Sequence, residues 1–138
     1  MEIVKLFDDN ILEKPDHSKL KIRKTTVLYT FSLVWTVQEQ CSLTSLNGRL
    51  KDGTWRQIIS HPYTDKDGEI SINIGNFAVG TEIEIAFGVK AITAIPKLMT
   101  LLTNRSSEKI MKLKPDGDEY KSPGVAETWN ESVSVTLI

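Results

Sequence analysis

The amino-acid sequence predicts a single all-β domain, an antiparallel β-sandwich of about seven to nine strands with at most one short helix. Apolar and polar residues alternate with a period of two in several segments, as they do in strands that bury one face. Asn-Gly pairs, Asp-Gly pairs and prolines separate these segments. A chain of 138 residues has the usual size of one domain, so we assign residues 1–138 to one sandwich.

The first strand is predicted over residues 27–37, where every odd-numbered residue is apolar or aromatic. The preceding residues 19–24 also alternate, with cations at Lys19, Lys21 and Arg23. A charged edge strand that blocks sheet-to-sheet pairing is the favoured interpretation of this segment. A polybasic patch that binds nucleic acid is the alternative.

A three-stranded meander is predicted next. A strand over residues 41–46 is closed by Asn47-Gly48, a pair that readily adopts the positive φ angles of a tight hairpin. A short strand follows, Asp52-Gly53 repeats the turn signal, and a third strand covers residues 54–60. His61-Pro62 ends that strand, because proline lacks the amide hydrogen that a ladder needs.

Two further strands follow turns that contain glycine. Asp67-Gly68 precedes residues 69–74, where three isoleucines share one face. Gly80 precedes residues 81–91, where isoleucine, phenylalanine and valine alternate with charged and small residues. Because residues 27–37 and 81–91 show the strongest alternation, we expect them to be inner strands of the sandwich.

The alternation breaks between residues 95 and 104. Pro96 fits the first turn of a helix, and the leucines at 98, 101 and 102 have helical spacing, so a short helix is predicted here. A strand with a loop is the alternative. The remaining segments are a weakly patterned strand over residues 109–114, a loop over 115–124 and a final strand over 132–138.

This pattern resembles the immunoglobulin and fibronectin type III class in strand number and chain length. The resemblance is architectural, because Cys41 is the only cysteine and the Cys-Trp-Cys core of antibody domains needs two. For the same reason no intrachain disulfide is expected. Sandwiches host many unrelated functions, so the resemblance implies a fold and no activity.

Composition and charge argue against several classes of partner. Seventeen basic and eighteen acidic residues give a net charge of −1, which does not favour nucleic acid or anionic lipid. No run approaches the roughly 18–20 apolar residues of a membrane span. The first residues include acids where a signal peptide needs basic residues and a long apolar run, so a signal peptide is not expected. The compartment stays open, with the cytoplasm as the default expectation.

The sequence contains no recognisable set of catalytic, metal-binding or cofactor-binding residues, and we predict none. His17 and His61 are the only imidazoles, and no neighbouring histidine activates Cys41 as a nucleophile. The Asp-Lys-Asp-Gly stretch that begins at Asp65 resembles the middle of an EF-hand loop but lacks the ligands at both ends, so a turn is favoured. A small hydrolase-like enzyme that uses His61, Asp65 and Asp67 is the less favoured alternative.

Aromatic residues outside the core strands are the strongest indication of a binding site. Four of them lie at predicted strand starts or in loops: Trp55, Tyr63, Tyr120 and Trp129. Such side chains stack on sugars or anchor protein partners, although they also shield the ends of a sandwich core. We therefore expect a non-catalytic binding module that recognises a carbohydrate or a protein through these four residues.

Assembly into a larger particle or fibre is the main alternative function. The segment from Ala91 to Leu102 carries one charge, at Lys97, and is either an exposed interface or a lid over the core. The C-terminal strand over residues 132–138 can pair with the sheet edge of a neighbour. A homo-oligomer through either segment is the second hypothesis.

Overall fold

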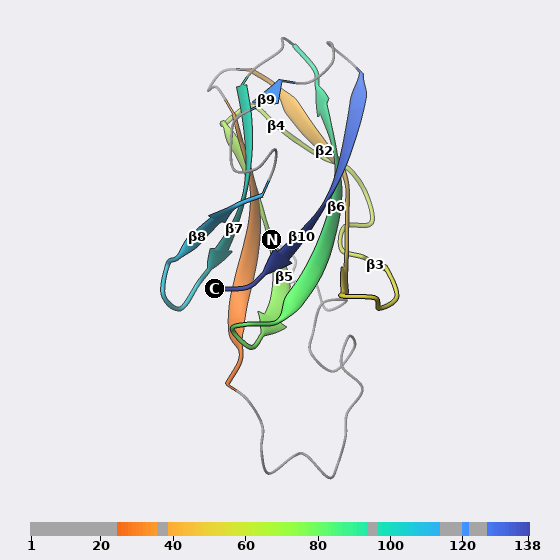
Figure 1. Cartoon of the computed structure of the whole chain (residues 1–138). Helices are drawn as coiled ribbons and strands as arrows, with labels where there is room; N and C mark the ends of the chain where they lie inside the picture. The colour runs from red at the N-terminus through yellow and green to blue at the C-terminus, as the bar shows by residue number, and fades with distance from the viewer. Residues whose placement is uncertain (1–24, 36–38, 94–96, 114–119, 122–126) are drawn as a thin grey trace.

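Two antiparallel sheets face each other in the computed structural model of the chain (Figure 1), and they form the β-sandwich that the sequence predicts. The structure describes residues 25–35, 39–93, 97–113, 120–121 and 127–138. Within these ranges each sheet has five strands, and there is no helix. The total of ten exceeds the expected seven to nine because four of the strands are only two or three residues long.

Sheet A has the strand order β5-β1-β7-β8, with β9 also paired to β7. Its strands are β1 (Val27–Trp35), β5 (Glu69–Phe77), β7 (Lys97–Asn104), β8 (Ile110–Lys112) and β9 (Tyr120–Lys121). Sheet B has the order β10-β6-β2-β3, with β4 also paired to β2. Its strands are β2 (Cys41–Leu50), β3 (Arg56–Gln57), β4 (Tyr63–Asp65), β6 (Glu82–Ala91) and β10 (Thr128–Thr136).

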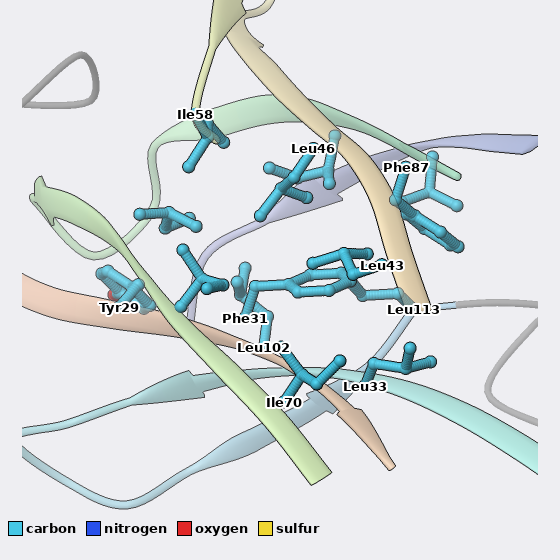
Figure 2. Close-up of a cluster of buried hydrophobic side chains, with 14 of the residues drawn as sticks. Tyr29, Phe31, Leu33, Leu43, Leu46, Ile58, Ile70, Phe87, Leu102 and Leu113 are labelled. Atoms are coloured by element: carbon cyan, nitrogen blue, oxygen red, sulfur yellow. The ribbon is translucent and has the colours of Figure 1, made fainter. Parts of the chain in front are cut away.

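The two strands with the strongest alternation are inner strands, as predicted. β1 pairs with β5 on one side and β7 on the other, and β6 pairs with β10 and β2. Their apolar faces meet between the sheets, where the rings of Phe31 and Phe87 lie 5.5 Å apart at an angle of 47° (Figure 2). Burial of each such side chain stabilises the fold by about 1.5–3 kcal/mol.

A β-bulge at Thr44 explains why the alternation in β2 is hard to read from the sequence. Leu43 pairs with Val89 and Ser45 pairs with Gly88, so Thr44 has no partner of its own in the ladder. One extra residue reverses which positions face the core. Leu43 and Leu46 are therefore both completely buried, although they are three residues apart.

Asn47-Gly48 does not form the predicted hairpin. β2 continues through both residues to Leu50, and Asn47 and Gly48 pair with β6 on one side and β3 on the other. Ladder hydrogen bonds on both sides therefore outweigh the local turn preference. Asp52-Gly53 does lie in a turn, and Asp52 has a φ of 61°.

The predicted short helix is wrong, and the alternative strand is correct. Residues 97–104 form β7, in which Leu98 and Leu102 are completely buried and Leu101 lies on the opposite face. Positions 98 and 102 share a face in a strand as well as in a helix, so their spacing does not discriminate. Residues 97–104 form a strand because they pair with the edge of β1 that β5 leaves free, where their backbone groups find hydrogen-bond partners.

Several predicted boundaries also change. The strand expected over residues 54–60 shortens to β3, the strand over 109–114 shortens to β8, and the last strand is β10, which begins four residues before residue 132 and ends at Thr136. The loop expected over residues 115–124 contains β9. The predicted cationic strand over residues 19–24, the end of the first strand at residues 36–37 and the start of the predicted helix at 95–96 lie outside the described residues.

Gly88 gives a direct test of sheet B. A Cβ at this position would lie 2.5 Å from Thr44 Oγ1 and 2.8 Å from both Ser45 Oγ and Asn130 Oδ1. We expect Gly88→Ala to lower the free energy of unfolding by about 1–2 kcal/mol, because the side chains of Thr44, Ser45 and Asn130 must leave their present rotamers to make room. Urea unfolding measures this change.

A second variant serves as the control for Gly88. In a Thr44→Ala background, the loss caused by Gly88→Ala is expected to be smaller, because the shortest contact is gone. A Gly88→Ala protein that is as stable as the native protein would contradict the packing described for this face.

Candidate functional site

The outer face of sheet A is polar at its centre. Because the odd-numbered residues of β1 face the core, Thr30 and Ser32 lie on the outer face. β5 places Ser71 and Asn73 directly beside them. Thr103 of β7 lies beside Thr30 on the other side. The rest of the outer face is therefore organised around two hydroxyl groups on the central strand.

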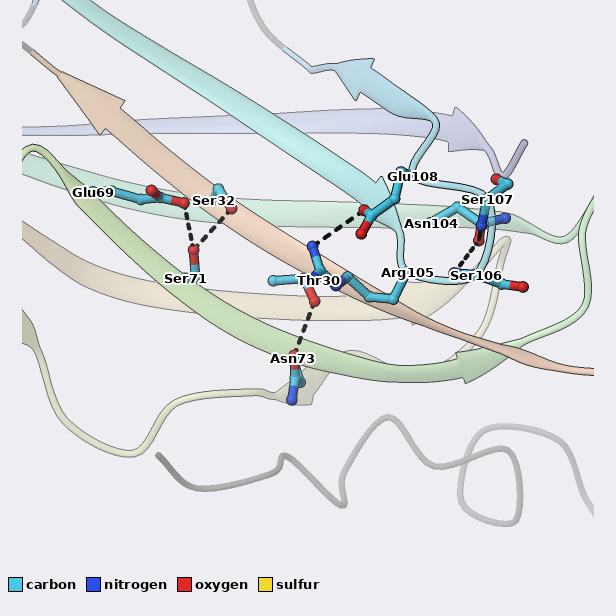
Figure 3. A network of polar contacts seen from close by, with 10 residues as sticks. All are labelled: Thr30, Ser32, Glu69, Ser71, Asn73, Asn104, Arg105, Ser106, Ser107 and Glu108. Carbon is cyan, nitrogen blue, oxygen red and sulfur yellow. Dashed lines mark hydrogen bonds and ion pairs between the residues drawn. The ribbon is translucent and has the colours of Figure 1, made fainter.

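Internal hydrogen bonds hold these side chains in place (Figure 3). Thr30 Oγ1 donates to Asn73 Oδ1 at 2.9 Å. Ser71 Oγ donates to Glu69 Oε2 at 2.8 Å and lies 3.0 Å from Ser32 Oγ. A serine hydroxyl has one hydrogen, so Ser32 must be the donor to Ser71. The hydrogens of both β1 hydroxyls are thus used within the protein.

A hollow of about 480 Å³ lies over this network. Hydroxyl, amide and carboxylate groups of β1 and β5 line one half of it. The other half is lined by Leu101 and Thr103 of β7, by Ile110 of β8 and by Arg105 and Glu108 of the turn between those strands. The hollow therefore combines polar groups with two aliphatic side chains.

Asn104 fixes the turn that closes one end of the hollow. Its Oδ1 accepts backbone N–H groups of Ser106 at 2.9 Å and Ser107 at 3.1 Å, and its Nδ2 donates to the carbonyl of Ile138 at 2.9 Å. Glu108 lies in this turn with a φ of 57°. Its Oε2 is 3.4 Å from Nη1 of Arg105, so the two side chains form an ion pair. Asn104 itself is 3% exposed, and both polar atoms of its side chain have hydrogen-bond partners.

Among Trp55, Tyr63 and Trp129, the members of the predicted aromatic set whose side chains the structure describes, Trp55 lies at the surface, with 39% of it exposed. Its ring stacks on the guanidinium of Arg49, whose central carbon is 4.5 Å from the ring centroid. Arg49 donates to Gly53 O at 3.2 Å and to Glu84 Oε2 at 2.9 Å. Because Arg49 pairs directly with Glu84 across the strands, Trp55 lies on the outer side of sheet B.

Tyr63 and Trp129 point toward the core. Trp129 pairs with Val89, Val89 with Leu43, and Leu43 with Tyr63, so these four residues form one row across sheet B. Residues in such a row share a face, and Val89 and Leu43 are completely buried. Both aromatic side chains are half-buried against the core, roughly 14 Å apart by strand spacing.

The structure does not gather the four predicted aromatics in one place. Trp55 adjoins Arg56, which pairs with Gly48, five residues along β2 from the row that contains Tyr63. Tyr120 pairs with Leu98 in sheet A, and its side chain lies outside the described residues. Ligand binding through this set stays a prediction, with Trp55 as its exposed member.

The groups considered for catalysis have structural partners. Burial, together with the charge of Glu39, raises the pKa of the Cys41 thiol to about 12. Backbone N–H groups of Asp67 and Lys66 hold the pKa of Asp65 below its usual range, at 2.9 and 2.7 Å from its Oδ1. Among the described residues, no three metal-ligating side chains gather at one point.

The two segments considered for assembly have different places in the fold. The apolar segment from Ala91 to Leu102 contributes Leu98 and Leu102 to the core, and Met99 and Leu101 to the half-buried outer face. The C-terminal strand β10 is an edge strand that pairs with β6 alone among the described strands. A homo-oligomer through either segment stays a prediction.

Within the part of the chain that the structure describes, there is no helix long and apolar enough to cross a bilayer. The comparisons with known proteins assign no family, because no family model and no curated protein matches the sequence. Similarity is detected to two solved structures. One is a domain of unknown function, DUF4425, from Bacteroides vulgatus ATCC 8482, which is 16% identical over 84% of this chain and 100% of its own, with a TM-score of 0.39. The other is a DUF4425 family protein from Bacteroides ovatus ATCC 8483, 16% identical over 80% of this chain and 96% of its own, with a TM-score of 0.32.

The hydrogen bond from Arg49 lowers the pKa of Glu84. Its contribution to stability is therefore fully present above the ordinary pKa of a glutamate and is lost as the pH falls through the lower pKa of the folded state. We expect Glu84→Gln to be less stable than the native protein at neutral pH, with a difference that closes as the pH falls below about 4. Urea unfolding at a series of pH values measures this difference.

Two features keep the Glu84 experiment interpretable. Asp65 titrates in both proteins, so its contribution cancels in the difference. In an Arg49→Gln background, Glu84→Gln is expected to produce a smaller pH-dependent difference, because only the backbone N–H of Asp52 and the charge of Lys51 still lower the pKa of Glu84. A difference that persists unchanged at low pH would show that the pair does not act through the charge of Glu84.

Proposed function

We propose that this protein is a non-catalytic binding module and that its ligand is a carbohydrate bound in the hollow on the outer face of sheet A. The proposal keeps the class of function expected from the sequence but moves the site from the aromatic residues to sheet A. The resemblance to immunoglobulin and fibronectin type III domains stays an expectation and says nothing about the ligand.

The observation that carries the proposal is a hollow whose polar side chains are fixed before any ligand arrives. Its volume of about 480 Å³ falls within the range of about 300–1,000 Å³ that is usual for small-molecule sites. The hydrogen bonds from Thr30 to Asn73 and from Ser71 to Glu69 hold its polar half in one arrangement. Side chains that are already ordered lose little entropy when a ligand binds.

The chemistry of the lining suits a sugar. Hydroxyl groups of a sugar can donate to the free lone pairs of Thr30 and Ser32, and can accept from Asn73 and Thr103. Leu101 and Ile110 offer aliphatic contacts to the C–H groups of a sugar ring. Polar groups on one side and apolar groups on the other match a molecule that carries both.

The surroundings of the titratable groups support a non-catalytic role. At neutral pH the thiol of Cys41 keeps its proton and is buried in the core. Asp65 accepts the backbone N–H groups of a turn, and His61 stacks on Tyr63 and lies 3.1 Å from the carbonyl of Pro62. Neither Asp65 nor His61 lines the hollow on sheet A, whose two carboxylates are Glu69 and Glu108.

A glycan array followed by titration calorimetry tests the proposal. Thr103→Val keeps the shape of the side chain and removes one hydroxyl from the hollow, so we expect affinity to fall about 3- to 10-fold. Thr136→Val makes the same change on the outer face of sheet B and is expected to leave affinity unchanged.

The outcome of this experiment separates the two locations of the site. Binding that Thr103→Val weakens and Trp55→Ala leaves intact supports the hollow. Binding that Trp55→Ala abolishes and Thr103→Val leaves intact would place the ligand at the aromatic residue instead. An array on which no glycan binds would overturn the carbohydrate proposal.

A further inference from the structure

Apart from the Nδ2 group of Asn73, which remains a donor, the half of the hollow formed by β1 and β5 presents hydrogen-bond acceptors. Thr30 gives its hydroxyl hydrogen to Asn73, Ser32 gives its hydrogen to Ser71, and Ser71 gives its own to Glu69. A hydroxyl whose hydrogen is used offers a ligand only lone pairs. The chain of bonds ends on Glu69, and an ionised carboxylate donates nothing. A ligand group that lies against Ser32, Ser71 and Glu69 must therefore bring hydrogens.

Electrostatics also favours a positively charged donor at this half of the hollow. Glu69 is exposed on β5 and has no cationic partner among the described residues. The other carboxylate of the lining, Glu108, already pairs with Arg105. Lys112 lies on the same face but on β8, roughly 14 Å from β5 by three strand spacings. Among the described residues, no cation forms an ion pair with Glu69 where the acceptors gather.

An ammonium group satisfies both conditions. It brings three hydrogen-bond donors and a positive charge, whereas a sulfate, phosphate or carboxylate brings acceptors and a negative charge. We propose that the β1–β5 half of the hollow is an ammonium subsite and that the bound carbohydrate contains an amino sugar with a free amine. This inference rests on the proposed carbohydrate function, and Glu69 is its specificity-determining residue.

Two oligosaccharides that differ only in the 2-substituent of each sugar, an amine in one and a hydroxyl in the other, test the subsite. The probes are tetramers of β-1,4-linked glucosamine and of β-1,4-linked glucose, or the galacto pair if the array identifies that series. At mildly acidic pH and low salt, we expect the amine-bearing tetramer to bind about tenfold more tightly. Salt at about 0.5 M is expected to reduce this ratio, because it screens an exposed charge pair.

Matched variants assign the preference to one carboxylate. Glu69→Gln keeps an oxygen that accepts from Ser71 but removes the charge, so the ratio between the two tetramers is expected to fall to about one. Glu108→Gln removes the charge at the other end of the hollow and is expected to keep the preference for the amine. Calorimetry on the full chain measures both.

The results distinguish a failure of the subsite from a failure of the function. Equal affinity of the native protein for both tetramers, or a preference that survives Glu69→Gln, would overturn the ammonium subsite and leave carbohydrate binding in place. Absence of binding to these tetramers and to every glycan of the array would overturn both proposals.

Discussion

The central strand of sheet A is buried on both of its faces, and this constraint organises the molecule. On the inner face, Phe31 meets Phe87 across the sandwich and fixes how the sheets pack. On the outer face, Thr30 and Ser32 are only 7% and 6% exposed, so their hydroxyls need partners within the protein. They find them on β5, and the same bonds order the side chains that line the hollow. The packed inner face and the polar outer face therefore have one origin, the alternation of apolar and polar residues along β1.

The sequence shows this alternation clearly, which is why the fold class and the two inner strands could be predicted. Prediction from the sequence fails where hydrogen bonding between strands overrides a local preference. The bulge at Thr44 changes which residues of β2 face the core, and no residue type marks it. Asn47-Gly48 has the composition of a hairpin but lies between two partner strands. The leucines of β7 fit a strand or a helix equally well until the edge of β1 is known to be free.

The candidate site was not predictable in the same way. Thr30, Ser71 and Thr103 read as ordinary solvent-facing positions, and only the strand order β5-β1-β7 places them side by side. A pattern of polar residues at even positions of β1 and at odd positions of β5 is a signal, but it is common to many outer faces. The aromatic residues were the more conspicuous feature, yet Tyr63 and Trp129 pack against the core. Their positions therefore fit the alternative to ligand binding, in which such residues shield the core of a sandwich.

The outer face of sheet A is the proposed binding site for a sugar, and this proposal can be tested directly. The most direct measurement is a nuclear magnetic resonance titration of the isotope-labelled chain with the glycan that an array identifies. We expect chemical-shift changes at the backbone amides of Thr30, Ser71 and Asn73 and in the β7–β8 turn, with the indole N–H of Trp55 unmoved. Changes confined to Trp55 and its neighbours on sheet B, with sheet A silent, would contradict the claim.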